Sequence, residues 1–240
     1  MKKLKLAALT AFISIMAIHI QAQTVDELQT SYIKALGGKE TLSSLKNIFV
    51  EVNMEVMGMQ MPAKQWIIYG IASRQEVAFQ GQKMITFIAK DKGWMINPLM
   101  GSTEARPIPD DAIKAAEGTL IAGSELTDYK TRGFTAVYEG KDTVNNIAAH
   151  KIILSRENYE STFYLDPNSY YVIRNVVKTE VDQQPVTQTT DFSDYRKTPE
   201  GFVFAYNTII SNAMVGEIRS SISKIEINTS LDIKALEQTN

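Results

Sequence analysis

Residues 50–56 read Val-Glu-Val-Asn-Met-Glu-Val, with an apolar side chain at every second position. Successive side chains of a β-strand point to opposite faces of its sheet, so this stretch predicts a strand with one buried and one solvated face. Gly58 ends the strand, and a second strand is expected from Gln65 to Ile71. Short strands joined by tight turns are typical of an antiparallel meander.

The same strand pattern recurs along most of the chain. Further strands are expected around Val77 and Phe79, and at Met84–Ala89, Trp94–Ile96, Phe134–Tyr138, Ala148–Leu154, Ser161–Asp166, Tyr171–Val181, Thr187–Tyr195, Phe202–Ile210 and Ser221–Ile227. They do not alternate with helices as a parallel sheet would require. We therefore expect one domain with about eleven antiparallel strands, which curl into an incomplete barrel.

Two segments have the pattern of helices. Thr24 and Glu27 form a capping box, apolar residues follow at helical spacing, and Gly37-Gly38 supplies a left-handed stop. A second helix is expected from Asp110-Asp111 to about Ala122. The predicted fold class is therefore mainly β with α (α+β), with an N-terminal helix and a helical lid over the concave face of the barrel.

The first 22 residues have the features of an export signal. Lys2, Lys3 and Lys5 precede an almost wholly apolar run, Leu6–Ile20, and the small residue Ala22 stands at a cleavage position. The rival interpretation is a retained membrane anchor, but that run is shorter than the roughly 20 residues of a transmembrane helix. We expect a signal peptide over residues 1–22, cleaved after Ala22, and a single mature domain over residues 23–240 in the periplasm.

Composition excludes several classes of function. The 240 residues include 25 basic and 27 acidic side chains, for a net charge of −2, so we expect no nucleic-acid partner. Cysteine is absent, which removes disulfides, thiolate nucleophiles and zinc–cysteine sites.

Residues that could carry catalysis are sparse. His150 is the only histidine after the signal segment, and it lies in an expected strand where a solvated or hydrogen-bonded side chain is the usual role. Asp110 and Asp111 are better explained as the first turn of a helix. No Gly-x-Ser-x-Gly elbow or phosphate-binding loop is present. We therefore expect no enzyme activity, no cofactor and no metal.

A binding role has more support, because methionines and both tryptophans concentrate between residues 54 and 100. Methionine is flexible and adapts to apolar partners of variable shape, although such residues also fill ordinary cores. The predicted wall of a lipid-binding cavity is Val52, Met54, Val56, Trp66, Ile68, Val77, Phe79, Trp94 and Ile96. The predicted lid is Leu99, Met100, Ile113, Leu120 and Ile121.

Several motifs in order resemble those of the LolA/LolB-like outer-membrane lipoprotein-sorting superfamily. They are Tyr32–Gly38 with Leu42 and Leu45-Lys46, Gly93–Pro98, Tyr164–Pro167, Asp191–Tyr195 and Gly201–Phe204. The similarity spans essentially the whole mature chain. Proteins of this family have an arginine, a proline and an asparagine after their second strand. Here the stretch Tyr69–Arg74 departs from that pattern, and two interpretations of Arg74 stay open: a displaced equivalent of the family arginine, or a turn residue.

The resemblance implies an open barrel with an apolar cavity for acyl chains. It implies a periplasmic carrier, without cofactor or covalent chemistry, that shuttles lipoproteins towards the outer membrane. The partners it implies are lipid acyl chains or lipoproteins, an inner-membrane releasing complex and an outer-membrane receptor, and we expect the carrier itself to be a monomer. Two alternatives stay open: a periplasmic carrier or sensor of another lipid or glycolipid, and a non-enzymatic structural domain.

Overall fold

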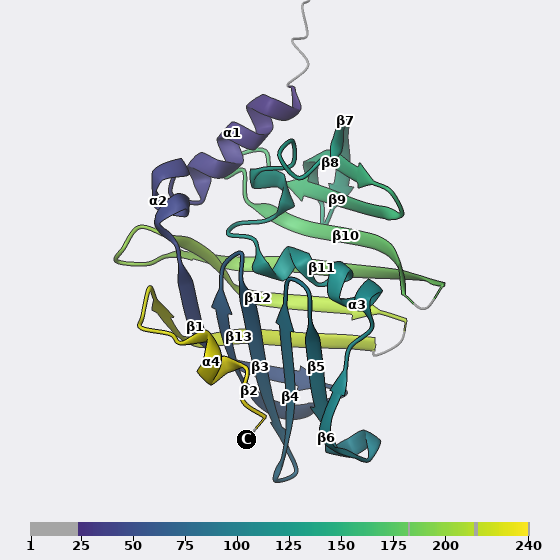
Figure 1. Cartoon of the computed structure of the whole chain (residues 1–240). Helices are drawn as coiled ribbons and strands as arrows, with labels where there is room; N and C mark the ends of the chain where they lie inside the picture. Colours follow the sequence, from purple (N-terminus) through teal and green to yellow (C-terminus); the bar gives the residue numbers. More distant parts are fainter. Residues whose placement is uncertain (1–23, 182, 214–215, 240) are drawn as a thin grey trace, which may run out of the picture.

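A single antiparallel sheet makes up most of the computed structural model, which describes residues 24–181, 183–213 and 216–239 (Figure 1). Its strands are β1 (Asn47–Val56), β2 (Met59–Ile68), β3 (Ala72–Phe79), β4 (Gln82–Ala89), β5 (Gly93–Asn97), β6 (Ser102–Pro107), β7 (Thr135–Val144), β8 (Ile147–Arg156), β9 (Tyr159–Leu165), β10 (Val172–Val181), β11 (Gln184–Lys197), β12 (Val203–Asn212) and β13 (Gly216–Ile227).

The strand order is β6-β5-β4-β3-β2-β1-β13-β12-β11-β10-β9-β8-β7. Strands that follow one another in the chain pair with each other, except β6 and β7, and β1 pairs with β13 and so joins the two halves of the sheet. The sheet is not closed, because β6 and β7 remain at its ends. In Figure 1, β2 to β6 run steeply across the direction of β10 to β13, so the sheet is strongly coiled.

The expectation of a mainly β, antiparallel and open sheet is confirmed. The described residues hold thirteen strands rather than about eleven. No pattern in the sequence predicts β6, because its residues lack apolar alternation and all but Ser102 are exposed at the edge of the sheet. Helices form only a small part of the fold, and the α+β label is therefore not confirmed.

The two faces of the sheet have different coverings. Ile48, Val50 and Val52 of β1 share one face, and Val52 lies opposite Ile222 of β13. We call this the inner face, and the opposite one, which carries Phe49, the outer face. On the inner face Ile48 and Val50 are buried together with Ile67 and nearby loop residues.

The N-terminal helix α1 (Val25–Ala35) has the expected start and stop. Thr24 Oγ1 accepts a hydrogen bond from the Glu27 backbone nitrogen at 3.2 Å, and the Glu27 carboxylate accepts one from the Thr24 nitrogen at 2.9 Å. Gly37 then takes a φ of +111°. A Cβ at Gly37 would lie 2.5 Å from the carbonyl oxygen of Gly201, so the glycine also permits close contact with the turn before β12.

The predicted lid helix is broken into short turns. The segment contains α3 (Asp110–Ala115) and two 3-10 turns, η2 (Glu117–Leu120) and η3 (Glu125–Thr127), so no helix extends to Ala122 and a helical lid is not confirmed. Gly118 accounts for part of the difference, since glycine disfavours a continuous helix. A third 3-10 turn, η1 (Pro98–Met100), lies between β5 and β6.

Two short helices complete the fold. Helix α2 (Lys39–Ser44) leads from α1 into β1, and α4 (Ile233–Leu236) follows β13 near the C-terminus. Figure 1 shows α4 in front of the strands β1 to β3. Leu236 packs with Phe87 and Ala72 in a buried cluster on the outer face.

The predicted signal peptide lies outside the described residues. Among the residues that are described, no helix combines the length and the apolar character needed to span a membrane.

Candidate functional site

A pocket of about 430 Å³ lies between the inner face of the sheet and the segments that cover it. Its floor comes from β9 to β13, and its roof comes from α1, α2 and the loop of residues 118–125. Its lining residues are Tyr32, Leu36, Leu42, Leu45, Tyr69, Gly118, Thr119, Ile121, Gly123, Ser124, Glu125, Tyr159, Phe163, Val172, Asn175, Val177, Gln188, Phe192, Tyr195, Phe202, Val203, Phe204, Ala205, Thr208 and Ile222.

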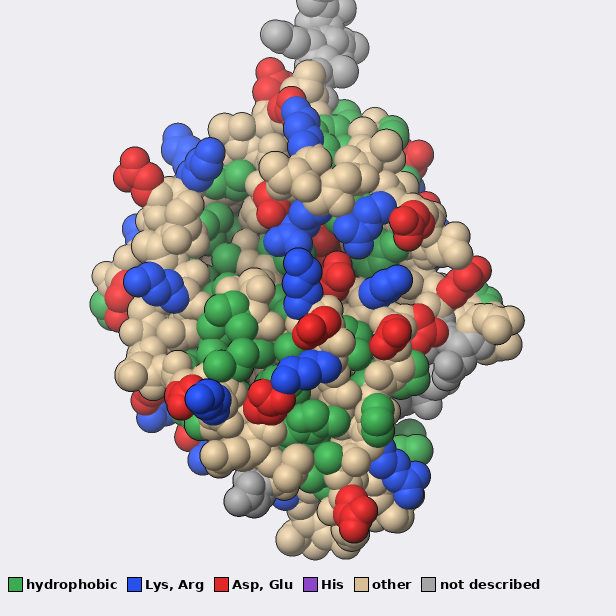
Figure 2. Space-filling model, viewed as in Figure 1, with side chains coloured by type: hydrophobic (Ala, Val, Ile, Leu, Met, Phe, Trp, Pro, Cys, Tyr) green, Lys and Arg blue, Asp and Glu red, His purple; other side chains and the backbone are tan. Residues whose placement is uncertain are grey.

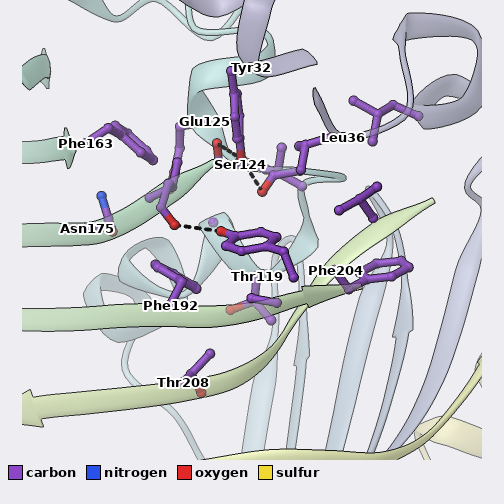
Figure 3. Close-up of a pocket in the computed structure, with 18 of the residues that line it drawn as sticks. Tyr32, Leu36, Thr119, Ser124, Glu125, Phe163, Asn175, Phe192, Phe204 and Thr208 are labelled. Carbon is purple, nitrogen blue, oxygen red and sulfur yellow. Dashed lines mark hydrogen bonds between the residues drawn. The ribbon is translucent and has the colours of Figure 1, made fainter. Parts of the chain in front are cut away.

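The roof is fixed to α1 by side-chain hydrogen bonds. The hydroxyl of Tyr32 lies 3.2 Å from the carbonyl oxygen of Gly123 and 3.2 Å from Ser124 Oγ, as Figure 3 shows for Ser124. Burial raises the pKa of Tyr32 to about 12. Tyr32 is therefore a neutral hydrogen-bond donor at physiological pH, and it holds the roof loop in place over the floor.

One carboxylate lies in this largely apolar site. Glu125 Oε1 accepts a hydrogen bond from the Tyr159 hydroxyl at 2.9 Å. Burial, followed by the nearby negative charge of Glu125, raises the pKa of Tyr159. Figure 3 shows the Glu125 side chain descending from the roof into the pocket, in the space between Phe163 and Tyr32.

A second space of about 760 Å³, which we call the outer chamber, adjoins the pocket. It is lined by Gln29, Thr30, Ile33, Lys39, Leu42, Ser43, Tyr69, Gly70, Leu120, Ile121, Ala122, Thr127, Asp128, Lys130, Thr131 and Arg132. Leu42, Tyr69 and Ile121 line both spaces, so these three residues form the boundary between them.

The outer chamber has more charged lining residues than the pocket, and two of its cations are paired. Lys130 Nζ lies 2.6 Å from Asp26 Oδ2, and Arg132 Nε lies 2.6 Å from Asp128 Oδ1. Lys39 is exposed at its rim. Charged side chains thus concentrate at the outer chamber, and Figure 2 shows basic and acidic side chains gathered across the middle of this face of the molecule.

The nine residues of the predicted cavity wall lie outside this pocket, and the structure divides them between the two faces of the sheet. Those on the inner face are Val52, Met54, Val56, Val77 and Phe79, and those on the outer face are Trp66, Ile68, Trp94 and Ile96. The expectation that all nine residues share one face of the sheet is therefore wrong.

The physical reason lies in the register of β1 and β2. Trp66 lies opposite Phe49, with ring centroids 5.1 Å apart, whereas Val52 lies opposite Ala63. Trp66 and Val52 thus point to opposite sides. On the outer face Trp66 and Trp94 pack against the cluster that α4 covers.

The five predicted lid residues also separate. Leu120 and Ile121 are buried over the inner face and line the outer chamber, and Ile121 lines the pocket as well. Ile113 is buried close to Gly93 of β5. Leu99 and Met100 are 49% and 76% exposed in η1, and neither of them lines the two spaces.

Arg74 and His150 lie outside the pocket, and each is hydrogen-bonded to other parts of the fold. The Arg74 side chain is on the outer face, where it bonds to Glu76 and to the C-terminal segment. His150 is buried on β8, with its Nδ1 2.9 Å from the Tyr138 hydroxyl, which matches the expected hydrogen-bonded strand histidine.

Most of the pocket was missed by pattern reasoning, although one signal pointed to it. Motifs that resemble the sorting superfamily include Tyr32–Gly38, Asp191–Tyr195 and Gly201–Phe204. Each of them supplies lining residues, among them Leu36, Phe192 and Phe204. The similarity therefore marked positions around the pocket that the methionine-rich pattern did not.

Comparison with solved structures places this open, pocketed sheet in the LolA-like fold. A LolA superfamily protein from Nitrosomonas europaea aligns with a TM-score of 0.59 and 8% identity, covering 90% of this chain and 99% of that one. A protein from Vibrio parahaemolyticus, described as an outer membrane lipoprotein-sorting protein domain, aligns with a TM-score of 0.56 and 12% identity over 89% and 97% of the two chains.

A third similar structure is a DUF1329 family protein from Desulfovibrio piger, with a TM-score of 0.59 and 10% identity over 90% of this chain and 98% of that one. No family model and no curated protein sequence matches the chain. At these identities the likeness is one of fold, and the resemblance seen in the sequence is confirmed at that level.

Proposed function

We propose that the protein is a periplasmic carrier that binds lipid acyl chains in the pocket and shuttles lipoproteins towards the outer membrane. The observation that carries this proposal is the pocket itself, which has a volume of about 430 Å³ and lies between a mainly apolar floor and the roof. Ligand pockets typically occupy about 300–1,000 Å³ and are lined mainly by apolar side chains with few polar groups. The likeness in fold to lipoprotein-sorting proteins supports the same role.

The energetics of acyl chains suit a pocket that is open at one side. Each buried methylene contributes about 0.8 kcal/mol, so a long chain that was wholly buried would dissociate too slowly for transport. The boundary residues Leu42, Tyr69 and Ile121 offer a passage from the outer chamber. A chain that threads between them would remain partly exposed and could be passed on to a receptor.

The proposal involves binding without catalysis. Among the described residues that line the pocket, Glu125 is the one acidic residue, and none is a lysine, arginine or histidine. The pocket lining therefore offers no pair of side chains for acid–base catalysis. The proposed partners are an inner-membrane releasing complex as the donor and an outer-membrane receptor as the acceptor, with the carrier acting as a monomer. A purely structural domain would be expected to pack this space with its own side chains.

The test is to extract the protein from its native host in mild detergent and to identify co-purifying lipid by mass spectrometry. Phe192→Asp introduces a charge into the pocket and should abolish the lipid. Phe79→Asp is the matched control, because Phe79 is half-buried on the same face but lies outside the pocket. Circular dichroism would establish that both variants fold.

The outcomes separate the possible functions. Lipoprotein in the wild type and in Phe79→Asp supports the sorting role, whereas another lipid or a glycolipid favours the alternative carrier or sensor. Loss of lipid from Phe79→Asp alone would move the site to the wall expected from sequence. Absence of any lipid from the wild type, together with no binding of added acyl chains, would contradict a carrier role.

A further inference from the structure

The charge inside the pocket is of one sign. The described lining residues include Glu125 but no lysine, arginine or histidine. Lys114, Arg132 and Arg156 line a small neighbouring cavity that Glu125 also lines, but none of the three lines the pocket, and Arg132 and Arg156 are paired with Asp128 and Glu117. A ligand group that enters the pocket therefore meets the Glu125 carboxylate as the one charged side chain among the described residues that line it.

The Glu125 carboxylate is held in place by its surroundings. Tyr159 donates a hydrogen bond to Oε1 at 2.9 Å. A Cβ added to Gly118 would lie only 2.4 Å from the same Oε1 atom. Gly118 thus makes room for the carboxylate. Within residues 24–239 as described, Tyr159 is the hydrogen-bond partner of Glu125, so the second oxygen is open to a donor from a ligand.

Asn175, on the pocket floor, also presents an acceptor. Its Nδ2 donates to Ser161 Oγ at 2.8 Å and to the carbonyl oxygen of Thr162 at 3.2 Å. Because the Thr162 carbonyl can only accept, the nitrogen must face it, and both amide hydrogens are then used. The remaining Oδ1 of Asn175 can only accept hydrogen bonds.

We infer that Glu125 makes the pocket selective for acyl chains whose polar end carries a hydrogen-bond donor, such as an amide, over chains that end in a carboxylate. This inference rests on the proposed acyl-chain carrier and names its ligand class. A donor would satisfy the second oxygen of Glu125, whereas a second carboxylate beside it would be repelled. Selectivity by repulsion of the wrong partner is a general device in binding sites.

The experiment compares two probes with the same twelve-carbon chain, dodecanoyl ethanolamide and laurate. Each displaces the neutral dye Nile red from the purified mature protein at neutral pH. The wild type should bind the ethanolamide at least about tenfold more tightly than laurate, which corresponds to about 1.4 kcal/mol. Glu125→Gln keeps the size of the side chain but removes its charge, and should reduce this preference to less than about threefold by tightening laurate binding.

Two further variants make the result specific. Glu117→Gln is the matched control, because Glu117 is an acid in the same roof segment that does not line the pocket, and it should keep the wild-type preference. Tyr159→Phe removes the hydroxyl but leaves the Glu125 charge, and should also disfavour laurate. Thermal melting would establish that each variant is folded.

The failures of the two proposals differ. If both probes bind and Glu125→Gln keeps the full preference for the ethanolamide, Glu125 is not the selectivity residue and this inference is overturned while the carrier function stands. If neither probe displaces Nile red from the wild type, the acyl-chain carrier function fails, and the inference falls with it.

Discussion

Arg74 Nη1 donates a hydrogen bond to the backbone carbonyl of Leu236 at 2.9 Å, joining residues that are 162 positions apart in the chain. The same nitrogen reaches the carbonyl oxygen of Gln238, and Nη2 lies 2.8 Å from Glu76 Oε1. The guanidinium also lies over the ring of Trp94, 5.7 Å from its centroid. Arg74 therefore fastens the C-terminal segment to the outer face of β3 and stands apart from the pocket.

Replacing Arg74 should release this segment. Arg74→Leu leaves two backbone carbonyls without their donor and leaves Lys83 as the remaining cation of Glu76. Loss of one member of a largely buried ion pair costs about 3–5 kcal/mol, and the remaining Lys83 contact places this loss at the lower end. We expect the free energy of unfolding in urea to fall by about 3 kcal/mol, the lower end of that range. Hydrogen exchange should accelerate at residues 233–238.

The control for Arg74 is an ion pair on the surface. Arg219 Nη2 lies 2.6 Å from Glu217 Oε1, and both side chains are about half exposed. Such pairs contribute about 0–1 kcal/mol, so Arg219→Leu should change stability little. Equal losses in the two variants would show that the Arg74 contacts do not hold the C-terminal segment.

The adjacent glycines after α1 allow two costs to be separated. Gly37 and Gly38 both have positive φ, at +111° and +93°, but only Gly37 lacks space for a Cβ, because the Gly201 carbonyl oxygen is in the way. Gly38→Ala should cost about 1–2 kcal/mol from backbone strain. Gly37→Ala should lose a further 1–3 kcal/mol or so from overpacking, measured by chemical denaturation. Similar losses would mean that the contact with Gly201 relaxes freely.

The sequence predicted local structure well where one face of an element is apolar. The capping box at Thr24, the glycine stop at Gly37 and the alternation of Val50, Val52 and Met54 all correspond to observed elements. These signals depend on the chemistry of a few neighbouring residues, so they survive without knowledge of the tertiary structure.

The site was harder to predict because apolar alternation does not identify a face when both faces are covered. Trp66, Ile67 and Ile68 are consecutive in β2, and this strand is covered on both faces. The loop around Leu120 covers its inner face, and Leu236 covers its outer face. The covering residues are distant in sequence, so local periodicity could not assign the tryptophans to the outer face.

The pocket floor was missed for the opposite reason. Asn175, Gln188 and Thr208 are polar residues of three neighbouring strands, and in the sequence they suggest a wet face. In the structure they line the pocket together with Phe192. A floor with polar groups among apolar ones suits a ligand site better than a dry core, but its pattern does not differ from that of a solvated strand.

Acid should weaken the fold through His150. Burial lowers the pKa of His150, Lys141 lowers it further, and Asp166 partly opposes them. The folded state therefore prefers neutral His150, and stability should be greatest above the unfolded pKa of about 6.5 and fall as the pH drops below it. The limiting slope for one proton is about 1.4 kcal/mol per pH unit.

The measurement for His150 is urea unfolding between pH 7.5 and 5.5. His150→Gln should reduce the pH dependence in this range, since the one other histidine, His19, lies in the predicted signal peptide and carboxylates titrate mainly at lower pH. An unchanged slope in the variant would assign the pH dependence to other groups.

The tryptophans can report where an acyl chain binds. Trp66 and Trp94 lie on the outer face, packed in the cluster with Phe87 and Leu236, and neither lines the pocket. A bromine-bearing form of dodecanoyl ethanolamide quenches indole fluorescence only near contact. Its binding in the pocket should therefore leave native tryptophan fluorescence almost unchanged, while Nile red displacement shows that it is bound.

A tryptophan inside the pocket supplies the positive control for this measurement. Phe192→Trp places an indole among the lining residues of the floor, and the brominated probe should then quench a saturable part of the emission at the concentrations that displace Nile red.

Strong, saturable quenching of Trp66 and Trp94 in the wild type would instead place the chain beside the wall expected from the sequence. Such a ligand would have to displace α4, because Leu236 of α4 is only 5% exposed and packs into the outer cluster. Arg74→Leu, which frees that segment, should then increase the quenching, whereas binding in the inner pocket predicts no such dependence.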